Sequence, residues 1–175
     1  MFKRILVPLD GSALAEQALP VVARLARASG SVISLVRVIS TEPASLPSAP
    51  GKPLLIQTIS EADRTMAENY LTDIAASDML KDLTVKTDVA VGLIAPTILS
   101  LAGDHFADLI VLCSHGFTGV SRWVLGSVAE KIIRYSPMPV LILREGGSVP
   151  IAKYSDQGED IRVLVPLDGS QYAET

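Results

Sequence analysis

Short apolar strands and amphipathic helices alternate along the chain, and this alternation limits the possible folds more than any other feature. Strand-like runs are expected at residues 3–9, 31–39, 84–91, 107–113 and 139–143. Apolar residues at helical spacing predict helices over 13–30, 60–77, 95–105 and 127–135. Five strands with four crossovers predict an α/β fold, an open parallel sheet with helices on both faces.

Two of the predicted strands read as continuous apolar runs, ILVPL near the start and LIVLC after residue 108. Such runs are typical of strands buried on both faces of a parallel sheet. Ligands of these sheets bind beyond the carboxyl ends of the strands, where the strand order reverses. The segments that follow the first and fourth strands are therefore the first places to look for a site.

Helix boundaries are marked by capping and breaking residues. Gly30 is placed to cap the first helical stretch, and Pro20 is expected to kink it. Ser60 and Asp63 form a capping box that opens the second helix. The four prolines between residues 41 and 59 predict a long loop.

The opening of the chain recurs near its end. RILVPLDGSALAE at 4–16 and RVLVPLDGSQYAE at 162–174 are identical at ten of thirteen aligned positions. Residues 145–160 between them are polar and Gly-rich, as in a linker. We interpret 1–144 as one domain and 161–175 as the first strand and turn of a truncated second copy. Because its strand is apolar, we expect the second copy to add to a sheet edge.

Composition excludes several classes of partner. The net charge is −4, which disfavours binding to nucleic acid or to an anionic membrane. Cys113 is the only cysteine, so it has no intrachain disulfide partner. No apolar run reaches the roughly 18 residues that span a bilayer, and the first residues leave no room for a secretory signal. These features predict a cytoplasmic protein.

Two segments fall at the predicted switch point. Asp10, Gly11 and Ser12 follow the first strand, and such residues are also ordinary turn and N-cap residues. In the second segment, Gly126 and Ser127 open a helix, with Ser127 and Glu130 spaced as a capping box. A helix N-terminus suits a phosphate, and Arg122 would add positive charge. An ordinary loop with a normal helix cap remains the alternative.

The second segment resembles the nucleotide-binding motif of the universal stress protein family, G-x2-G-x9-G-(S/T). Gly116, Gly126 and Ser127 match its last three elements in spacing, and Ser114-His115-Gly116 resembles the family's S-H-G. The strand sequence ILVPLDGS and the run SPMPV at 136–140 are also similar to the family. The resemblance covers residues 1–144 and implies a Rossmann-like sheet of order 3-2-1-4-5.

The resemblance implies ATP binding, with Mg²⁺. Asp10 would meet the ribose or adenine side, Val38 would contact adenine through its backbone, and Gly126 and Ser127 would hold phosphates. The full set of expected nucleotide contacts is Pro8, Asp10, Gly11, Ser12, Val38, Cys113, Ser114, His115, Gly116, Gly126, Ser127 and Val128. The chain departs from the motif at Cys113, where the family has its first glycine. The thiol is tolerated if φ there is below zero.

Neither histidine is expected to be catalytic. No second His, Cys or carboxylate is placed beside His115, for which the resemblance implies a nucleotide contact. His105 falls at the end of a helix, where a positive charge is favourable. Cys113 is interpreted as a small hydrophobic residue rather than a redox sensor.

The last predicted strand, 139–143, is apolar and lies at a sheet edge in the implied order. An apolar edge tends to pair with another chain, so a homodimer through this strand is expected.

The functional hypothesis is a regulatory ATP-binding domain with hydrolysis slow or absent. The alternatives are a phosphoryl- or adenylyl-transfer enzyme, or an interaction module without nucleotide. The sequence shows no P-loop lysine and no metal-ligand carboxylate cluster, and this argues against the enzyme.

Overall fold

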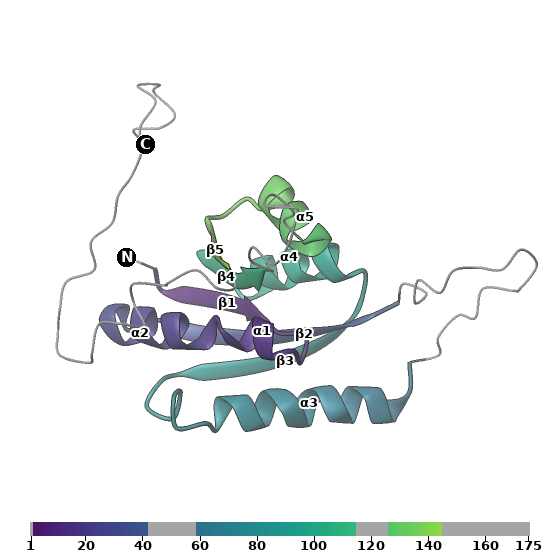
Figure 1. Cartoon of the computed structure of the whole chain (residues 1–175), viewed down its shortest axis with the longest axis horizontal. Coiled ribbons are helices and arrows are strands. Elements are labelled where there is room, and N and C mark those ends of the chain that lie inside the picture. The colour runs from purple at the N-terminus through teal and green to yellow at the C-terminus, as the bar shows by residue number, and fades with distance from the viewer. Residues whose placement is uncertain (1, 42–58, 115–125, 145–175) are drawn as a thin grey trace, which may run out of the picture.

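The chain forms an open parallel sheet flanked by helices. The computed structural model describes residues 2–41, 59–114 and 126–144 (Figure 1). The strands are β1 (Arg4–Pro8), β2 (Val32–Ser40), β3 (Val85–Gly92), β4 (Leu109–Ser114) and β5 (Val140–Arg144). The helices are α1 (Ala13–Glu16), α2 (Leu19–Ser29), α3 (Glu61–Ala75), α4 (Ile94–Asp104) and α5 (Ser127–Tyr135). Strand boundaries differ from the predicted ones by at most two residues.

The strand order is β3-β2-β1-β4-β5, and all neighbouring pairs are parallel. This confirms the expected order 3-2-1-4-5 with helices on both faces. Ile5 of β1 lies opposite Ile33 of β2 and Leu109 of β4, so β1 occupies the centre of the sheet. The order reverses between β1 and β4, which places the switch point at the carboxyl ends of these two strands.

Each face of the sheet has its own hydrophobic core. Ile5 and Val7 pack with residues of α2 and α3 on one face, while Leu6 packs with residues of α4 and α5 on the other. All three side chains are fully buried. The side chains of β1 thus alternate between two apolar layers, which explains its continuous apolar sequence.

The predicted kink at Pro20 is a short interruption of the helix, in which Gln17 and Ala18 form a turn. The helical stretch divides into α1 and α2, and Pro20 takes a position in the first turn of α2, where its missing N–H costs nothing. Gly30 caps α2 in the left-handed conformation, with φ of 67°, as predicted. Ser12 caps α1 by accepting a hydrogen bond from the Ala15 N–H at 3.1 Å.

One predicted capping box is confirmed and one is wrong. Ser60 and Asp63 bond reciprocally at the start of α3. At α5 the N-cap residue is Gly126, and no side chain caps the helix. Ser127 is the first residue of the helix, one position after the N-cap, so its hydroxyl does not cap the helix N-terminus. Glu130 pairs instead with Arg134 at 2.9 Å.

Several predictions fall on undescribed residues. These are the loop at 41–59, apart from its two ends, together with His115, Gly116 and Arg122, the linker at 145–160 and the second copy at 161–175. Across the described ranges, no helix is long and apolar enough to cross a membrane.

Candidate functional site

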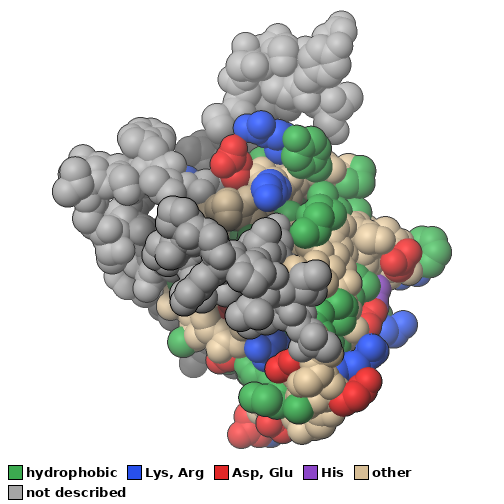
Figure 2. Space-filling view, turned by 90° about the vertical axis from the view of Figure 1, so that its right-hand side faces the viewer, with side chains coloured by type: hydrophobic (Ala, Val, Ile, Leu, Met, Phe, Trp, Pro, Cys, Tyr) green, Lys and Arg blue, Asp and Glu red, His purple; other side chains and the backbone are tan. Residues whose placement is uncertain are grey.

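A cavity of about 310 Å³ opens at the carboxyl ends of the central strands. Its walls come from β1, β2 and β4, from the turn that leads into α1, and from the N-terminal parts of α4 and α5. The cavity therefore lies at the switch point of the sheet. Seen from this end of the sheet, acidic and basic side chains are interspersed among hydrophobic ones (Figure 2).

The floor of the cavity is apolar. Val36 and Val38 of β2 lie there with Leu112 of β4, and Ile94 and Ile98 of α4 face them. Such a surface suits a flat apolar group such as an aromatic base, with polar groups at its margins fixing the orientation.

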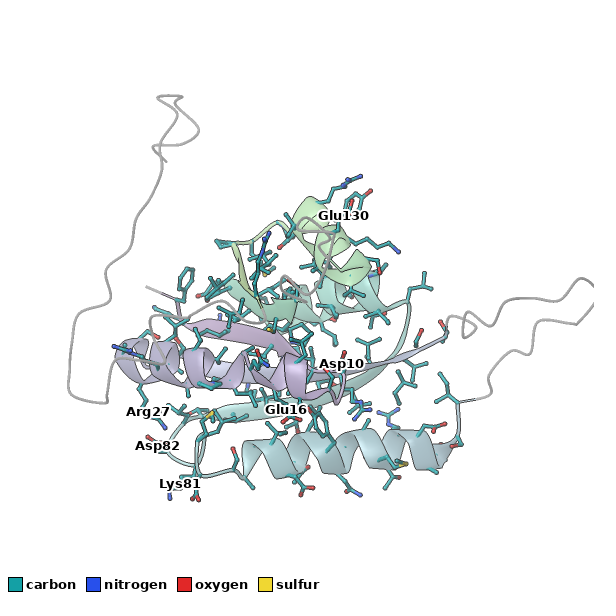
Figure 3. The ribbon with its side chains drawn as sticks, in the orientation of Figure 1. Asp10, Glu16, Arg27, Lys81, Asp82 and Glu130 are labelled. Atoms are coloured by element: carbon teal, nitrogen blue, oxygen red, sulfur yellow. The ribbon has the colours of Figure 1, made fainter. Side chains whose placement is uncertain are left out.

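The turn after β1 supplies one polar margin of the cavity. Asp10 and Ser12 both line it. One carboxylate oxygen of Asp10, Oδ1, accepts a hydrogen bond from the Ser12 N–H at 2.9 Å, and the Ser12 hydroxyl caps α1. The Asp10 side chain lies at the end of β1 beside α1 (Figure 3). It is an exposed acceptor whose position is set by the turn.

Ser114 supplies a polar group at the end of β4. The residue is only 4% exposed, and among the described residues its Oγ has no hydrogen-bond partner. A buried hydroxyl left unpaired costs about 1–3 kcal/mol. Because Ser114 lines the cavity, a ligand there offers the partner that this hydroxyl lacks.

The N-terminus of α5 forms the opposite polar margin. Gly126 caps this helix of nine residues without a side chain, and Ser127 and Val128 begin its first turn. The first N–H groups of a helix have no intrahelical partner and lie at the positive end of its dipole. Among the described residues, a Cβ at Gly126 would meet no atom within 4 Å.

Cys113 fits the backbone at its position. It lies within β4, half-buried, and also lines the cavity. Among the described residues only Phe106 is a non-glycine with positive φ, so Cys113 has ordinary strand geometry. The condition under which a thiol is tolerated in place of the family's glycine is therefore met.

The structure brings most of the predicted contacts together. The predicted residues that line the cavity are Pro8, Asp10, Ser12, Val38, Cys113, Ser114, Gly126, Ser127 and Val128. Gly11 does not line it, and His115 and Gly116 lie outside the described residues. Sequence analysis missed Val36, Ile94 and Ile98. The spacing of Val36 two residues before Val38, and of Ile94 four before Ile98, is the signal that identifies shared faces.

His105 lies away from the cavity. It caps the C-terminus of α4 as expected, but its ring is bonded to Ser34 and Asp88 rather than serving only as a terminal charge. The described part of the chain contains no cluster of three His, Cys, Asp or Glu side chains suited to a metal ion.

Fold and cavity together define a doubly wound α/β protein with a cavity at its switch point, where the β1 turn and the start of α5 meet. The profile of the universal stress protein family matches residues 1–144. The chain belongs to the universal stress protein family.

Individual relatives support this assignment. The chain is 31% identical over 160 residues to universal stress protein MJ0577 of Methanocaldococcus jannaschii, covering 85% of this chain and 98% of that protein. A universal stress protein of Thermus aquaticus is 32% identical over 145 residues, with 82% and 100% covered. The solved structure of MJ0577 matches with a TM-score of 0.57 over 85% of this chain and 99% of that one.

Proposed function

We propose that the cavity binds an adenine nucleotide, ATP with Mg²⁺, and that the bound nucleotide regulates contacts of this domain with partners. The observation that carries the proposal is the unpaired, buried hydroxyl of Ser114 in a cavity that also receives the N-terminus of α5. Two solved universal stress proteins with this fold, at 22% and 21% identity, are in complex with cAMP and dAMP.

Three groups of lining residues would contact the base, the ribose and the phosphates of the nucleotide. The base would lie on the apolar floor near Val38, and the Asp10 carboxylate would accept hydrogen bonds from ribose hydroxyls. Phosphates would lie before α5, where the N–H groups of Ser127 and Val128 and the Ser127 hydroxyl are available. Mg²⁺ would offset the negative charge of the phosphates.

Regulation rather than turnover follows from the chemistry of the lining. Asp10 is the one carboxylate among the described lining residues, and no histidine is among them. General acid–base catalysis needs a group within hydrogen-bond reach of the reacting atoms. We therefore expect hydrolysis of ATP to be slow or absent, and rapid turnover would favour the phosphoryl-transfer alternative.

The first test is to denature the purified protein and to identify released nucleotide by chromatography, followed by thermal-shift measurements with ATP and Mg²⁺. Gly126→Asp places a carboxylate before α5 and should abolish both signals by repelling phosphate. Gly103→Asp is the matched control, because a Cβ at Gly103 of α4 also meets no atom of the described residues within 4 Å. Absence of nucleotide and of any shift in the wild type would favour an interaction module that binds no nucleotide.

We also propose that two chains associate through the outer edge of β5. This strand pairs only with β4 in the described sheet, and Val140, Leu141 and Ile142 are only partly buried. An unpaired apolar edge is a template for a second strand. Sedimentation should show a dimer that Ile142→Lys weakens, while Met66→Lys on the exposed face of α3 leaves it intact. A wild type that stays monomeric at high concentration would refute the proposal.

The repeat supports a further proposal about organisation. Residues 161–175 match the sequence that forms β1 and its turn, and we propose that they begin a second copy of the domain after a linker at 145–160. Because their strand sequence is apolar, we propose that these residues add to a sheet edge of their own or of a partner chain. Deleting residues 151–175 should then lower stability or change the oligomeric state, and a deletion variant identical to the wild type in both would refute this docking.

A further inference from the structure

Arg37 lies directly behind the turn that carries Asp10. Its neighbours two residues away along β2, Leu35 and Ile39, pack in the core beneath α2 and α3, so Arg37 points to the same face. A Cβ built on Gly11 would lie 3.2 Å from Nη2 and 3.3 Å from Nη1 of Arg37. The guanidinium is thus packed against the backbone of Gly11.

The guanidinium of Arg37 also contacts an aromatic ring. Cζ of Arg37 lies 5.0 Å from the ring centroid of Tyr70 in α3, a cation–π contact. The Tyr70 hydroxyl donates to Oε1 of Glu16 at 2.9 Å. Burial, and then the bond to the Glu16 carboxylate, raise the pKa of Tyr70 well above its usual value, so the hydroxyl stays a neutral donor.

These contacts form a closed chain behind the cavity. Glu16 ends α1, the helix that Ser12 caps, and Figure 3 shows it on the side of α1 toward α3. The sequence of contacts runs from the turn to Arg37, to Tyr70, to Glu16, and through α1 back to the turn. Two elements distant in sequence, β2 and α3, therefore support one three-residue turn together with the adjacent α1.

The turn needs this support because its backbone is unusual. Gly11 has φ of 87°, in the region that side chains rarely adopt, and Asp10 and Ser12 on either side of it line the cavity. Arg37 itself does not line the cavity. A small movement of Gly11 would redirect the Asp10 carboxylate, and a planar cation packed against it limits that movement.

We propose that Arg37 is a positioning residue for the nucleotide site, which holds the Asp10 carboxylate where it accepts hydrogen bonds from the ribose hydroxyls. The inference rests on the proposed function, and it implies that the site is selective for nucleotides that carry ribose hydroxyls. It also implies that α3 influences nucleotide affinity, because Tyr70 of α3 contacts Arg37.

The test compares the affinities for ATP and for 2′,3′-dideoxy-ATP, which lacks both hydroxyls, by calorimetric titration with Mg²⁺. Arg37→Met should weaken ATP binding about tenfold, the cost of one hydrogen bond to a charged group. It should leave the affinity for dideoxy-ATP unchanged, so discrimination between the two is lost. Arg37→Lys should restore part of the discrimination, and Tyr70→Phe, which keeps the ring, should reduce it less than Arg37→Met.

Lys86→Met is the matched control, because it removes one positive charge from an exposed position on the neighbouring strand β3. It should leave both affinities as in the wild type. Equal weakening of both ligands by Arg37→Met would mean a general structural role and would overturn the inference, as would unchanged discrimination. A wild type that binds neither nucleotide would overturn the proposed function itself, a distinct result.

Discussion

Nε2 of His105 lies 2.9 Å from Oδ2 of Asp88, and Nδ1 of the same ring lies 3.1 Å from Oγ of Ser34. The ring joins the C-terminus of α4 to β2 and β3. Serine, histidine and aspartate are also the residue types of a hydrolytic triad. Ser34 is only 4% exposed inside β2, so a substrate has no access to its hydroxyl. The three residues therefore connect elements rather than catalyse a reaction.

Removing the imidazole should destabilise the fold. His105→Ala leaves the buried Ser34 hydroxyl without its partner, and we expect the free energy of unfolding to fall by about 1–3 kcal/mol. Adding Ser34→Ala should recover part of this loss, because no unpaired hydroxyl then remains. Urea denaturation of the two single variants and the double variant measures the coupling, and additive effects would show that the ring and the hydroxyl do not interact in solution.

Asp108 anchors the start of β1. Its carboxylate accepts hydrogen bonds from the Lys3 N–H at 2.7 Å and the Arg4 N–H at 3.0 Å. Asp108→Ala should lower the free energy of unfolding by about 1–3 kcal/mol, since hydrogen bonds to a charged group are lost. Asp108→Asn keeps one acceptor and should cost less. Asp104→Ala, an exposed carboxylate at the end of α4, should have little effect, and equal losses at 104 and 108 would contradict this role.

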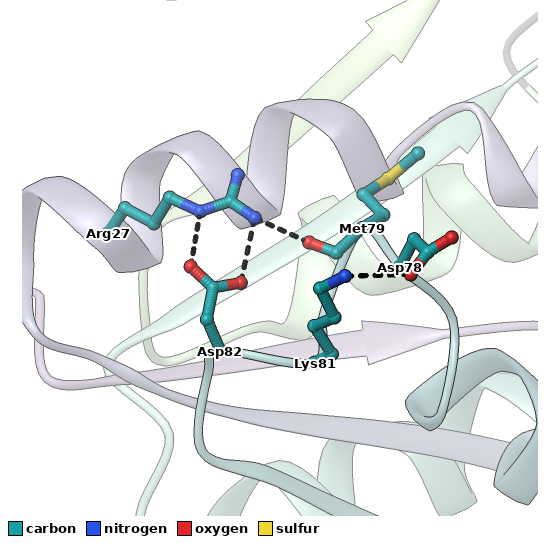
Figure 4. Close-up of polar contacts among 5 residues, drawn as sticks. All are labelled: Arg27, Asp78, Met79, Lys81 and Asp82. Carbon is teal, nitrogen blue, oxygen red and sulfur yellow. Dashed lines mark hydrogen bonds and ion pairs between the residues drawn. The ribbon is translucent and has the colours of Figure 1, made fainter.

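A bidentate ion pair ties α2 to the segment before β3. Nε and Nη2 of Arg27 each lie 3.0 Å from a carboxylate oxygen of Asp82, and Nη2 also donates to the Met79 carbonyl at 2.7 Å (Figure 4). The hydrogen bonds from Arg27 lower the pKa of Asp82 below its usual 3.8. The folded state thus binds the proton more weakly than the unfolded chain does.

The lowered pKa of Asp82 determines how the stability of the fold changes with pH. The contribution of Asp82 is fully present above pH 3.8, its unfolded pKa, and is lost as the pH falls through the lower folded value. Asp82→Asn should therefore reduce the acid sensitivity of stability, measured by urea denaturation between neutral pH and acid. Asp78→Asn is the control, because that side chain is 96% exposed and its pair with Lys81 contributes little. Superimposable pH profiles for the wild type and Asp82→Asn would refute the assignment.

Gly92, at the end of β3, is closely packed against α4. A Cβ there would lie 2.5 Å from Oγ1 of Thr97. Gly92→Ala should cost about 1–3 kcal/mol, since packed side chains or backbone must shift to admit the methyl group. Gly103→Ala, with no atom within 4 Å of its Cβ, should instead stabilise α4 by about 0.5–1 kcal/mol. Thermal unfolding would test both, and Thr97→Ala should rescue Gly92→Ala if the clash is real.

The sequence predicted features that depend on local patterns. The strand order was predicted from the family resemblance, and a kink at Pro20 was predicted from its fixed φ and missing N–H, whereas the structure has an interruption between α1 and α2. The start of α5 was predicted within one residue, yet the role of Ser127 was wrong because a cap depends on a single position. The resemblance supplied most of the cavity's polar residues, whereas the apolar floor was missed.

Contacts between elements distant in sequence could not be predicted from the sequence. Arg37 is 26 residues from Gly11, and His105 is 71 residues from Ser34, so their contacts follow from how the helices pack on the sheet. Helical and strand periodicities report which face a residue occupies, and they carry no information about the partner on the opposing element. Nothing in the chain's pattern set His105 apart from an ordinary helix-terminal charge.

Ser114 gives opposite predictions for stability and binding. Ser114→Ala removes an unpaired buried hydroxyl, so the free energy of unfolding of the nucleotide-free protein should rise or stay unchanged. Affinity for ATP should fall about tenfold if the hydroxyl bonds the nucleotide. Urea denaturation and calorimetry on the same preparations measure the two quantities. Lower stability with unchanged affinity would assign the hydroxyl to folding alone.

Calorimetric titration of the wild-type chain with ATP and Mg²⁺ tests the central claim most directly. We predict saturable binding of about one nucleotide per chain at the switch-point cavity, with no binding to Gly126→Asp and full binding to Gly103→Asp. Absence of binding to the wild type, or equal binding to the two aspartate variants, would contradict the assignment of this cavity as a nucleotide site.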